Sequence, residues 1–156
     1  MSRKTRFVYL SLGIVSMALL TQCAVNTPAP QTAARQFTRM ASCPDSPNCV
    51  STLAPPDDSV HAIAPIPFSG SAEAAKAQLL EIVAAMPRTQ IIEDEGDYLH
   101  VEYRSQIFRF VDDVEFQIDD SAKLIQFRSA ARVGYGDMGV NRKRMEEVRT
   151  RFAESK

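Results

Sequence analysis

The sequence is poor in the residues from which catalytic and metal centres are most often built. Its 156 residues include only two histidines, His61 and His100, and three cysteines. The two histidines lie far apart in strand-like segments, and the sequence has no G-x-S-x-G pattern or other recognisable set of nucleophile and base. Zinc would need two ligands beyond a pair of cysteines. We therefore expect neither a metal site nor a cofactor.

The sequence also lacks an apolar run of the length that spans a membrane, about 20 residues. Its longest uncharged apolar segment, residues 7–20, is shorter and follows three basic residues among the first six. This arrangement is typical of a secretory leader. We therefore predict a signal peptide over residues 1–22.

Residues 20–23, LTQC, resemble the cleavage box of bacterial lipoproteins, and the resemblance implies a lipid on Cys23. Gln22 departs from that pattern, which usually has a small residue there, so an ordinary signal peptide and an uncleaved anchor are the alternatives. Residues 23–42 predict the lipid attachment and a flexible tether. We expect an exported protein on the periplasmic face of a membrane. The outer membrane is favoured over the inner one because Ala24, and not aspartate, follows the cysteine.

Negative charge is in modest excess once the leader is removed. The formal net charge is −1 for the whole sequence, and the loss of the leader's three cations changes it to −4. Affinity for nucleic acid comes largely from Lys and Arg that neutralise phosphates, so we expect no nucleic-acid partner. The expected partners are the membrane, through a lipid anchor, and an unknown small ligand or envelope protein.

Cys43 and Cys49 enclose the short segment CPDSPNC. In an oxidising compartment such a pair is a candidate for a disulfide, which the chain-entropy model values at about 2.4 kcal/mol for a loop of about 7 residues. Pro44 and Pro47 pre-bend this loop and favour its closure. We predict the disulfide; free thiols and a metal site are the alternatives.

The remaining sequence, residues 43–156, predicts a single α+β domain. Apolar stripes at helical spacing predict helices over residues 72–86 and about 141–154. Between them, alternating segments and turn residues predict an antiparallel meander of about four or five strands. A short edge strand is predicted over residues 60–68, and a bulge or corner near residues 108–111. Both helices are expected to cover the same apolar face of the sheet.

The opposite face of the predicted sheet is unusually charged. Its charged residues are Glu102, Arg104, Asp113, Glu115, Arg128 and Arg132. Opposite charges on neighbouring strands can pair, so this face is either a solvated surface of ion pairs or a groove for a polar ligand. Asp113 and Glu115 are possible acid–base groups. Neighbouring arginines would lower the pKa of these carboxyls and make them poor general acids.

The segment between the last strand and the last helix, residues 128–144, has the sequence RSAARVGYGDMGVNRKR. Its GYGDMG matches G-x-G-x-x-G. We expect no dinucleotide site, because only one helix is predicted after this segment and the second parallel strand of such a site is missing. Arg142, Lys143 and Arg144 oppose the dipole of the helix that begins there. They either bind an anion or form salt bridges to acidic residues of the domain.

Three segments resemble, in this order, the motifs of the family called domain of unknown function 1499. They are residues 43–51 (CPDSPNCVS), residues 110–116 (FVDDVEF) and the glycine-rich segment just described. The family occurs in exported or membrane proteins of bacteria and in plastid proteins, and the resemblance extends over about residues 43–152. Ala131 stands where the family motif often has serine, so we expect no catalytic hydroxyl there. The resemblance implies a fold and a compartment but no reaction.

We therefore predict an uncharacterised lipid-anchored periplasmic domain that is a non-catalytic binding or envelope-associated module. The alternative is an envelope hydrolase that uses the acidic residues of the DDVE segment, residues 112–115. The candidate ligand-binding residues are Arg104, Asp113, Glu115, Arg128, Arg132, Asp137, Asn141 and Arg142.

Overall fold

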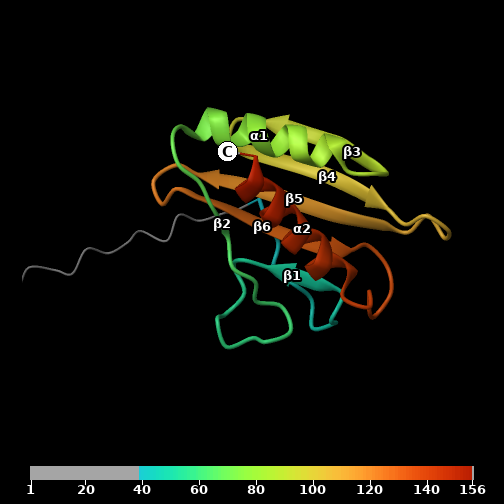
Figure 1. Ribbon diagram of the computed structural model, residues 1–156. Coiled ribbons are helices and arrows are strands. Elements are labelled where there is room, and N and C mark those ends of the chain that lie inside the picture. Colours follow the sequence, from blue (N-terminus) through green and yellow to red (C-terminus); the bar gives the residue numbers. More distant parts are fainter. Residues whose placement is uncertain (1–38, 156) are drawn as a thin grey trace, which may run out of the picture. The chain divides into compact units, whose positions relative to one another are not determined.

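The computed structural model describes residues 39–155, in which two helices pack on one face of an antiparallel sheet (Figure 1). The elements are β1 (Cys49–Ser51), β2 (Ile66–Pro67), α1 (Ala72–Ala85), β3 (Thr89–Glu95), β4 (Tyr98–Arg104), β5 (Val111–Asp119), β6 (Leu124–Ala131) and α2 (Val140–Glu154). The predicted signal peptide, Cys23 and nearly all of the predicted tether lie outside the described residues. Within residues 39–155 no helix is long and apolar enough to cross a membrane.

The sheet confirms the predicted meander and adds short strands at one edge. β3, β4, β5 and β6 pair in sequence order, and both β1 and β2 pair with the free edge of β6. The edge strand predicted over residues 60–68 is reduced to Ile66–Pro67. Proline lacks the N–H that a strand ladder needs, which explains why this proline-containing segment pairs over only two residues.

The predicted corner near residues 108–111 is the end of the loop that connects β4 and β5, residues 105–110. Ser105 closes this loop, because its N–H donates to the carbonyl oxygen of Phe110 at 2.8 Å. The sheet has a register shift in β3 between Ile91 and Glu93. Since β3 is an edge strand, this bulge interrupts the row of free backbone groups that would otherwise pair with another chain.

Both helices have the boundaries that their sequence signals predict, to within one residue. Ser71 caps α1, since its side chain accepts a hydrogen bond from the N–H of Ala74. Pro87 follows the last turn and cannot continue the helix. α2 begins after Gly139, whose φ of 76° lies in the left-handed region that favours glycine. Both helices lie in front of the sheet in Figure 1 and cover the same face.

The hydrophobic core lies between this face and the helices. Each element contributes its predicted apolar stripe, and the rings of Phe116 and Phe127 lie 6.3 Å apart at its centre. The most deeply buried core residues include Leu79, Val83, Leu99, Val101, Val114, Phe116, Ile125, Phe127, Met145 and Val148. Because side chains alternate along a strand, the charged positions of β4, β5 and β6 other than Asp112 lie on the opposite face. Asp112 lies on the side of the helices and pairs with Arg144 of α2.

The opposite face is partly covered by the first described residues. The guanidinium of Arg39 lies 4.0 Å from the ring centroid of Tyr98 and forms ion pairs with Glu93 and Glu95. The chain then continues to Cys43, which is bonded to Cys49 on β1. The charged face therefore has a polypeptide segment across it and is not fully open to solvent.

Candidate functional site

A network of ion pairs joins most of the charged face. Arg132 lies at its centre, with Nη2 at 2.6 Å from Oδ1 of Asp113 and at 2.7 Å from Oε1 of Glu102. Arg104 completes the pairing of Glu102 through an Nη2–Oε2 distance of 2.6 Å. His100 Nε2 lies 2.9 Å from Asp113 Oδ1. The predicted site residues Arg104, Asp113 and Arg132 thus come together, but each is held by a neighbouring side chain.

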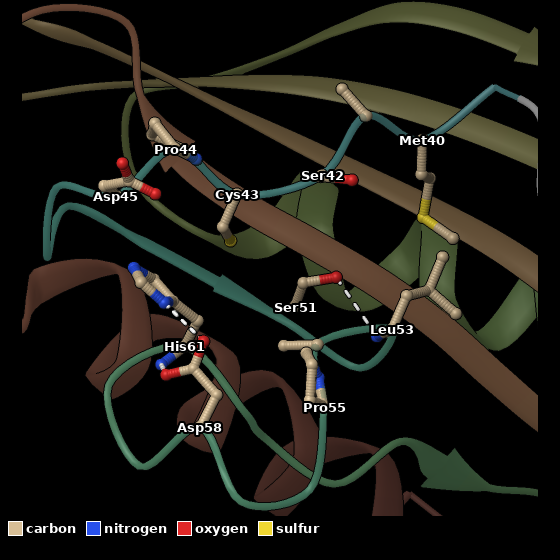
Figure 2. A pocket seen from close by; sticks show the side chains of 12 residues that line it. Met40, Ser42, Cys43, Pro44, Asp45, Ser51, Leu53, Pro55, Asp58 and His61 are labelled. Atoms are coloured by element: carbon tan, nitrogen blue, oxygen red, sulfur yellow. Dashed lines mark hydrogen bonds and ion pairs between the residues drawn. The ribbon is translucent and has the colours of Figure 1, made fainter.

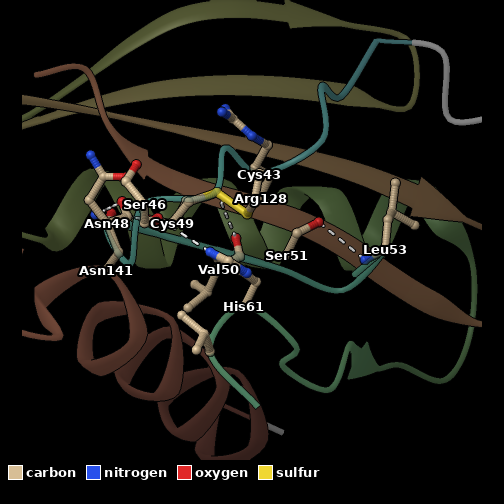
Figure 3. The surroundings of a disulfide bond; sticks show 12 residues. Cys43, Ser46, Asn48, Cys49, Val50, Ser51, Leu53, His61, Arg128 and Asn141 are labelled. Atoms are coloured by element: carbon tan, nitrogen blue, oxygen red, sulfur yellow. Dashed lines mark hydrogen bonds between the residues drawn. A yellow bond between two sulfur atoms is a disulfide. The ribbon is translucent and has the colours of Figure 1, made fainter. Parts of the chain in front are cut away.

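A second cluster lies beside this network. Nη1 of Arg128 is 3.1 Å from Oε2 of Glu115, and the hydroxyl of Tyr98 donates to Oε1 of Glu115 at 3.0 Å. Figure 3 shows Arg128 among the surroundings of the disulfide between Cys43 and Cys49. Both Arg128 and Glu115 are largely buried by this arrangement.

The electrostatics of Asp113 follow from its partners. Burial of the carboxyl favours its neutral form, but hydrogen bonds from Arg132 and His100 outweigh burial and hold the pKa of Asp113 below its ordinary value. The same carboxylate and Glu102 raise the pKa of Arg132. Asp113 is therefore ionised at neutral pH and is a poor proton donor.

The predicted residues Asp137 and Asn141 lie at the corner between β6 and α2. The carboxylate of Asp137 accepts hydrogen bonds from the N–H groups of Gly139 and Asn141, at 2.9 and 2.7 Å, and so satisfies the start of the helix. The side chain of Asn141 is buried, and its Oδ1 accepts from the hydroxyl of Ser129. Its Nδ2 donates to the carbonyl oxygen of Asn48 at 3.1 Å. These polar groups fasten the corner to β6 and to the disulfide loop.

Two of the three basic residues at the start of α2, Arg142 and Arg144, have different roles. Nη2 of Arg144 lies 2.6 Å from Oδ2 of Asp112, and its guanidinium lies 4.5 Å from the ring centroid of Tyr103. Arg142 instead donates to the carbonyl oxygens of Val60 and Ala62 and contacts no carboxylate in the described part of the chain. The predicted salt bridges of this basic run are thus present for Arg144 and absent for Arg142.

The predicted disulfide between Cys43 and Cys49 is confirmed, with a Cα–Cα distance of 5.7 Å (Figure 3). It positions Asn48, whose carbonyl oxygen accepts the N–H of Ala131. The side-chain Nδ2 of Asn48 donates to the carbonyl oxygen of Gly134 at 2.5 Å. The disulfide loop, the end of β6 and the glycine-rich loop therefore meet at one asparagine.

A small cavity of about 190 Å³ lies beside the disulfide (Figure 2). It contains a hydrogen-bonded pair that the sequence did not predict, in which Nδ1 of His61 lies 2.7 Å from Oδ2 of Asp58. The hydrogen bond to Asp58 is the main reason why the pKa of His61 is raised. Ser51 also lines the cavity, but its hydroxyl accepts from the N–H of Leu53 and points away from His61. Ser51, His61 and Asp58 therefore do not form a nucleophile–base–acid triad.

A larger cavity of about 380 Å³ lies at the end of the sheet, below the first turn of α2. Met86 and Tyr103 are buried at its base, while Arg88, Arg104 and Lys143 lie around it. The cavity is also lined by Asp112 and Glu147, but these carboxylates pair with Arg144 and Arg151. Lys143 is exposed and forms no ion pair within residues 39–155, and Nε of Arg88 donates only to a carbonyl oxygen. We call Met86, Arg88, Tyr103, Arg104 and Lys143 the cationic cavity.

Comparison with known families identifies a match over residues 39–152 to "Protein of unknown function (DUF1499)". The chain belongs to the DUF1499 family. A comparison with curated proteins finds no match. The family assignment confirms the resemblance carried by the three sequence motifs.

The eight predicted site residues of this DUF1499 domain do not form one site. Arg104, Asp113 and Arg132 lie in the first cluster of the charged face, and Glu115 and Arg128 lie in the second. Asp137 and Asn141 hold the β6–α2 corner, and Arg142 donates to carbonyl oxygens of the segment before β2. No group of three or more histidine, cysteine, aspartate or glutamate residues in the described chain is arranged to hold a metal ion. Sequence reasoning missed Arg88 and the position of Lys143 in the cationic cavity, because these residues come from segments with no common motif. A basic residue directly after a helix-ending proline was the available signal for Arg88.

Proposed function

We propose that this DUF1499 domain is a non-catalytic binding module, held at the periplasmic face of a bacterial membrane by a lipid on Cys23. The proposed membrane is the outer one. The proposed ligand is a small amphipathic anion that occupies the cationic cavity. The domain binds its ligand without transforming it.

The observation that carries this proposal is the combination of an apolar base with unpaired cations. Met86 and Tyr103 offer a buried apolar surface, and burial raises the pKa of Tyr103, so its hydroxyl stays neutral. Lys143 and Arg88 have no carboxylate partner among the described residues. The carboxylates that line the cavity are paired with Arg144 and Arg151, so Lys143 and Arg88 remain available to attract an anion. The apolar base favours a ligand with a hydrocarbon part.

The charged face supports a structural role rather than a second ligand site. Asp113 and Glu102 share Arg132, and Glu115 binds Arg128, so a ligand would have to displace contacts that already satisfy these groups. A buried charge that loses its partner destabilises the protein. The lowered pKa of Asp113 also argues against a hydrolase that uses this carboxyl as its general acid.

The binding site can be tested by titrating the ¹⁵N-labelled domain with dodecanoate, an amphipathic anion, below its micelle concentration. We expect amide shifts around residues 86–88 and Lys143. The substitution Lys143→Ala should raise the Kd about fivefold, since a half-exposed ion pair contributes roughly 1 kcal/mol. Lys76→Ala is the matched control, because Lys76 is also a helical lysine but lies far from the cavity and pairs with Asp94. An equal Kd for Lys143→Ala and the wild type would refute the site.

Anchoring has an independent test. Replacement of Cys23 by serine should abolish globomycin-sensitive processing of the precursor and the incorporation of labelled palmitate into the protein. Fractionation of the wild type on a density gradient distinguishes the outer from the inner membrane. Unchanged processing and unchanged palmitate labelling for Cys23→Ser would exclude the lipid anchor.

A further inference from the structure

We propose that one end of the sheet docks on the surface of an anionic lipid bilayer. This surface, which we call the apolar tip, consists of Ile107, Phe108, Phe110, Val133, Tyr135, Met138 and Val140. The inference goes beyond the proposed function. It requires neither the lipid on Cys23 nor a ligand in the cationic cavity.

Exposed apolar side chains gather at this end of the domain. The described residues include eleven exposed large hydrophobic side chains, and seven of them belong to the apolar tip. Met138 is fully exposed, and Ile107, Tyr135 and Phe108 are 80%, 78% and 72% exposed. A cluster of this kind, unlike scattered single residues, marks an interaction surface.

The sheet register brings the two loops of the apolar tip to the same edge. Arg104 at the end of β4 pairs with Val111 at the start of β5, and Asp112 pairs with Ala131 at the end of β6. The loops 105–110 and 132–139 therefore leave the sheet side by side. Figure 1 shows both at the right-hand end of the domain, where the β4–β5 loop extends beyond the end of α1.

The loops are held in the conformation that exposes these side chains. The hydroxyl of Ser105 accepts the N–H of Phe110 at 2.9 Å, and the rings of Phe108 and Phe110 stack with centroids 5.6 Å apart. In the other loop, Asp137 accepts the N–H groups of Gly139 and Asn141. Hydrogen bonds within each loop thus fix its shape, while its apolar side chains stay in water.

The distribution of charge identifies the partner as an anionic lipid surface. Arg88, Arg104, Arg109 and Lys143 lie at the same end as the apolar tip. The turns at the other end of the sheet are acidic, since the described residues of these turns include Asp94, Glu95, Asp97, Asp119 and Asp120 but only one cation, Lys123. A domain polarised in this way turns its cationic end toward an anionic membrane and its acidic end away from it.

The side chains of the tip also fit a bilayer interface. Aromatic and aliphatic groups can enter the boundary between headgroups and acyl chains, and Tyr135 can keep its hydroxyl among the headgroups. Arginine and lysine extend their charged groups to the phosphates from beside such a surface. Asp137, the one carboxylate within the two loops, is already bonded to backbone N–H groups.

The length of the tether allows this contact in an anchored protein. The first described residue, Arg39, contacts Glu95 next to the β3–β4 turn, at the end opposite the apolar tip. The sixteen residues from Cys23 to Arg39 span at most about 55 Å when extended. The nine-residue strand β5 is about 30 Å long. A chain anchored at Cys23 is therefore long enough for the tip to reach the same membrane.

Vesicle co-sedimentation tests the inference with the mature chain, residues 23–156, in which Cys23→Ser prevents lipidation. Every contact described above lies within residues 39–155, so removal of the leader disturbs none of them. The chain should bind vesicles of phosphatidylglycerol and phosphatidylethanolamine. Phe108→Asp and Met138→Asp should each lower the partition coefficient about tenfold. Val60→Asp is the matched control, since Val60 is 49% exposed but lies outside the tip.

The cationic contribution is separable from the apolar one. Arg109→Ala should lower partitioning into the anionic vesicles about fivefold, with no change for vesicles of phosphatidylcholine. Since all substituted side chains are exposed, the thermal unfolding midpoint should stay that of the wild type. Phe108→Asp should still bind dodecanoate. The proposal for the cationic cavity and the proposal for the apolar tip can therefore be refuted separately.

Two results would overturn the inference. The first is a wild-type chain that binds anionic vesicles no better than its Phe108→Asp variant. The second is a monomer–dimer equilibrium, measured by sedimentation, that Phe108→Asp abolishes while no vesicle binding occurs. The apolar tip would then be a surface between two copies of the chain.

Discussion

The ion pair between Asp112 and Arg144 offers the sharpest test of how the domain is held together. It joins β5 to α2, and the side chains are 12% and 11% exposed. Arg144 also donates to Asn141 Oδ1 at 2.7 Å and lies against the ring of Tyr103. Asp112→Ala removes the carboxylate and leaves a largely buried guanidinium whose remaining hydrogen-bond partners, Ser129 and Asn141, are neutral.

The expected cost follows from the burial of the pair. Removing one partner of a buried ion pair costs about 3–5 kcal/mol. We expect the lower end, about 3 kcal/mol, because Arg144 keeps its hydrogen bond to Asn141 and its cation–π contact with Tyr103. The double substitution of Asp112→Leu with Arg144→Met replaces both charges by apolar groups. It should cost less than Asp112→Ala alone, because no charge is left buried without a partner.

Urea unfolding followed by circular dichroism measures these costs as differences in the free energy of unfolding. Glu147→Ala is the control, since Glu147 pairs with Arg151 on the surface of α2 and both side chains are over 40% exposed. Such a pair contributes less than about 1 kcal/mol. The reasoning fails if Asp112→Ala costs no more than Glu147→Ala. It also fails if the double substitution costs the sum of its two single substitutions.

Three further predictions concern other parts of the domain. Reduction of the Cys43–Cys49 disulfide should lower the free energy of unfolding by about 2 kcal/mol in urea titrations with and without dithiothreitol, and no change would exclude a stabilising role. The raised pKa of His61, caused mainly by its hydrogen bond to Asp58, stabilises the fold at about pH 5 and loses this effect as the pH rises through that pKa. His61→Asn should therefore destabilise more at about pH 5 than at about pH 8 in paired unfolding titrations, and an equal loss would contradict this origin. Met138→Gly should stabilise the domain by about 0.5 kcal/mol, because Met138 has a φ of 56° that glycine adopts without strain. A lower unfolding midpoint would contradict that account.

The faces of the sheet are predictable from the sequence because side chains alternate along a strand. Val114 and Phe116 are buried under the helices, whereas Asp113 and Glu115 lie on the charged face, as the pattern of β5 predicts. The pairing of opposite charges across strands follows from the same alternation, and it is observed between Glu115 and Arg128. Local periodicity therefore carries information about which residues share a face.

The contacts made by α2 are not predictable in this way. Arg142 has one acidic residue, Glu146, four positions away on its own helix, yet it donates to the carbonyl oxygen of Ala62, 80 positions away in the chain. The segment that offers this carbonyl was predicted as part of the edge strand over residues 60–68, but only Ile66–Pro67 forms a strand. Its course depends on β1 and β2 pairing with β6. The cationic cavity escaped prediction for the same reason, since Arg88 and Lys143 meet only when the sheet has formed.

The segment that carries the most distinctive motif, residues 128–144, contains two kinds of side chain, those with partners inside the domain and those without. Nearly all its charged and amide side chains have partners inside the domain, so folding accounts for them. Lys143 has no ion pair in the described chain, and Tyr135 and Met138 point their side chains into water. Met138 even combines full exposure with a left-handed backbone, which costs stability on both counts. Residues that the fold does not need, and that it holds at some energetic cost, are therefore the ones on which the proposed apolar tip and cationic cavity rest.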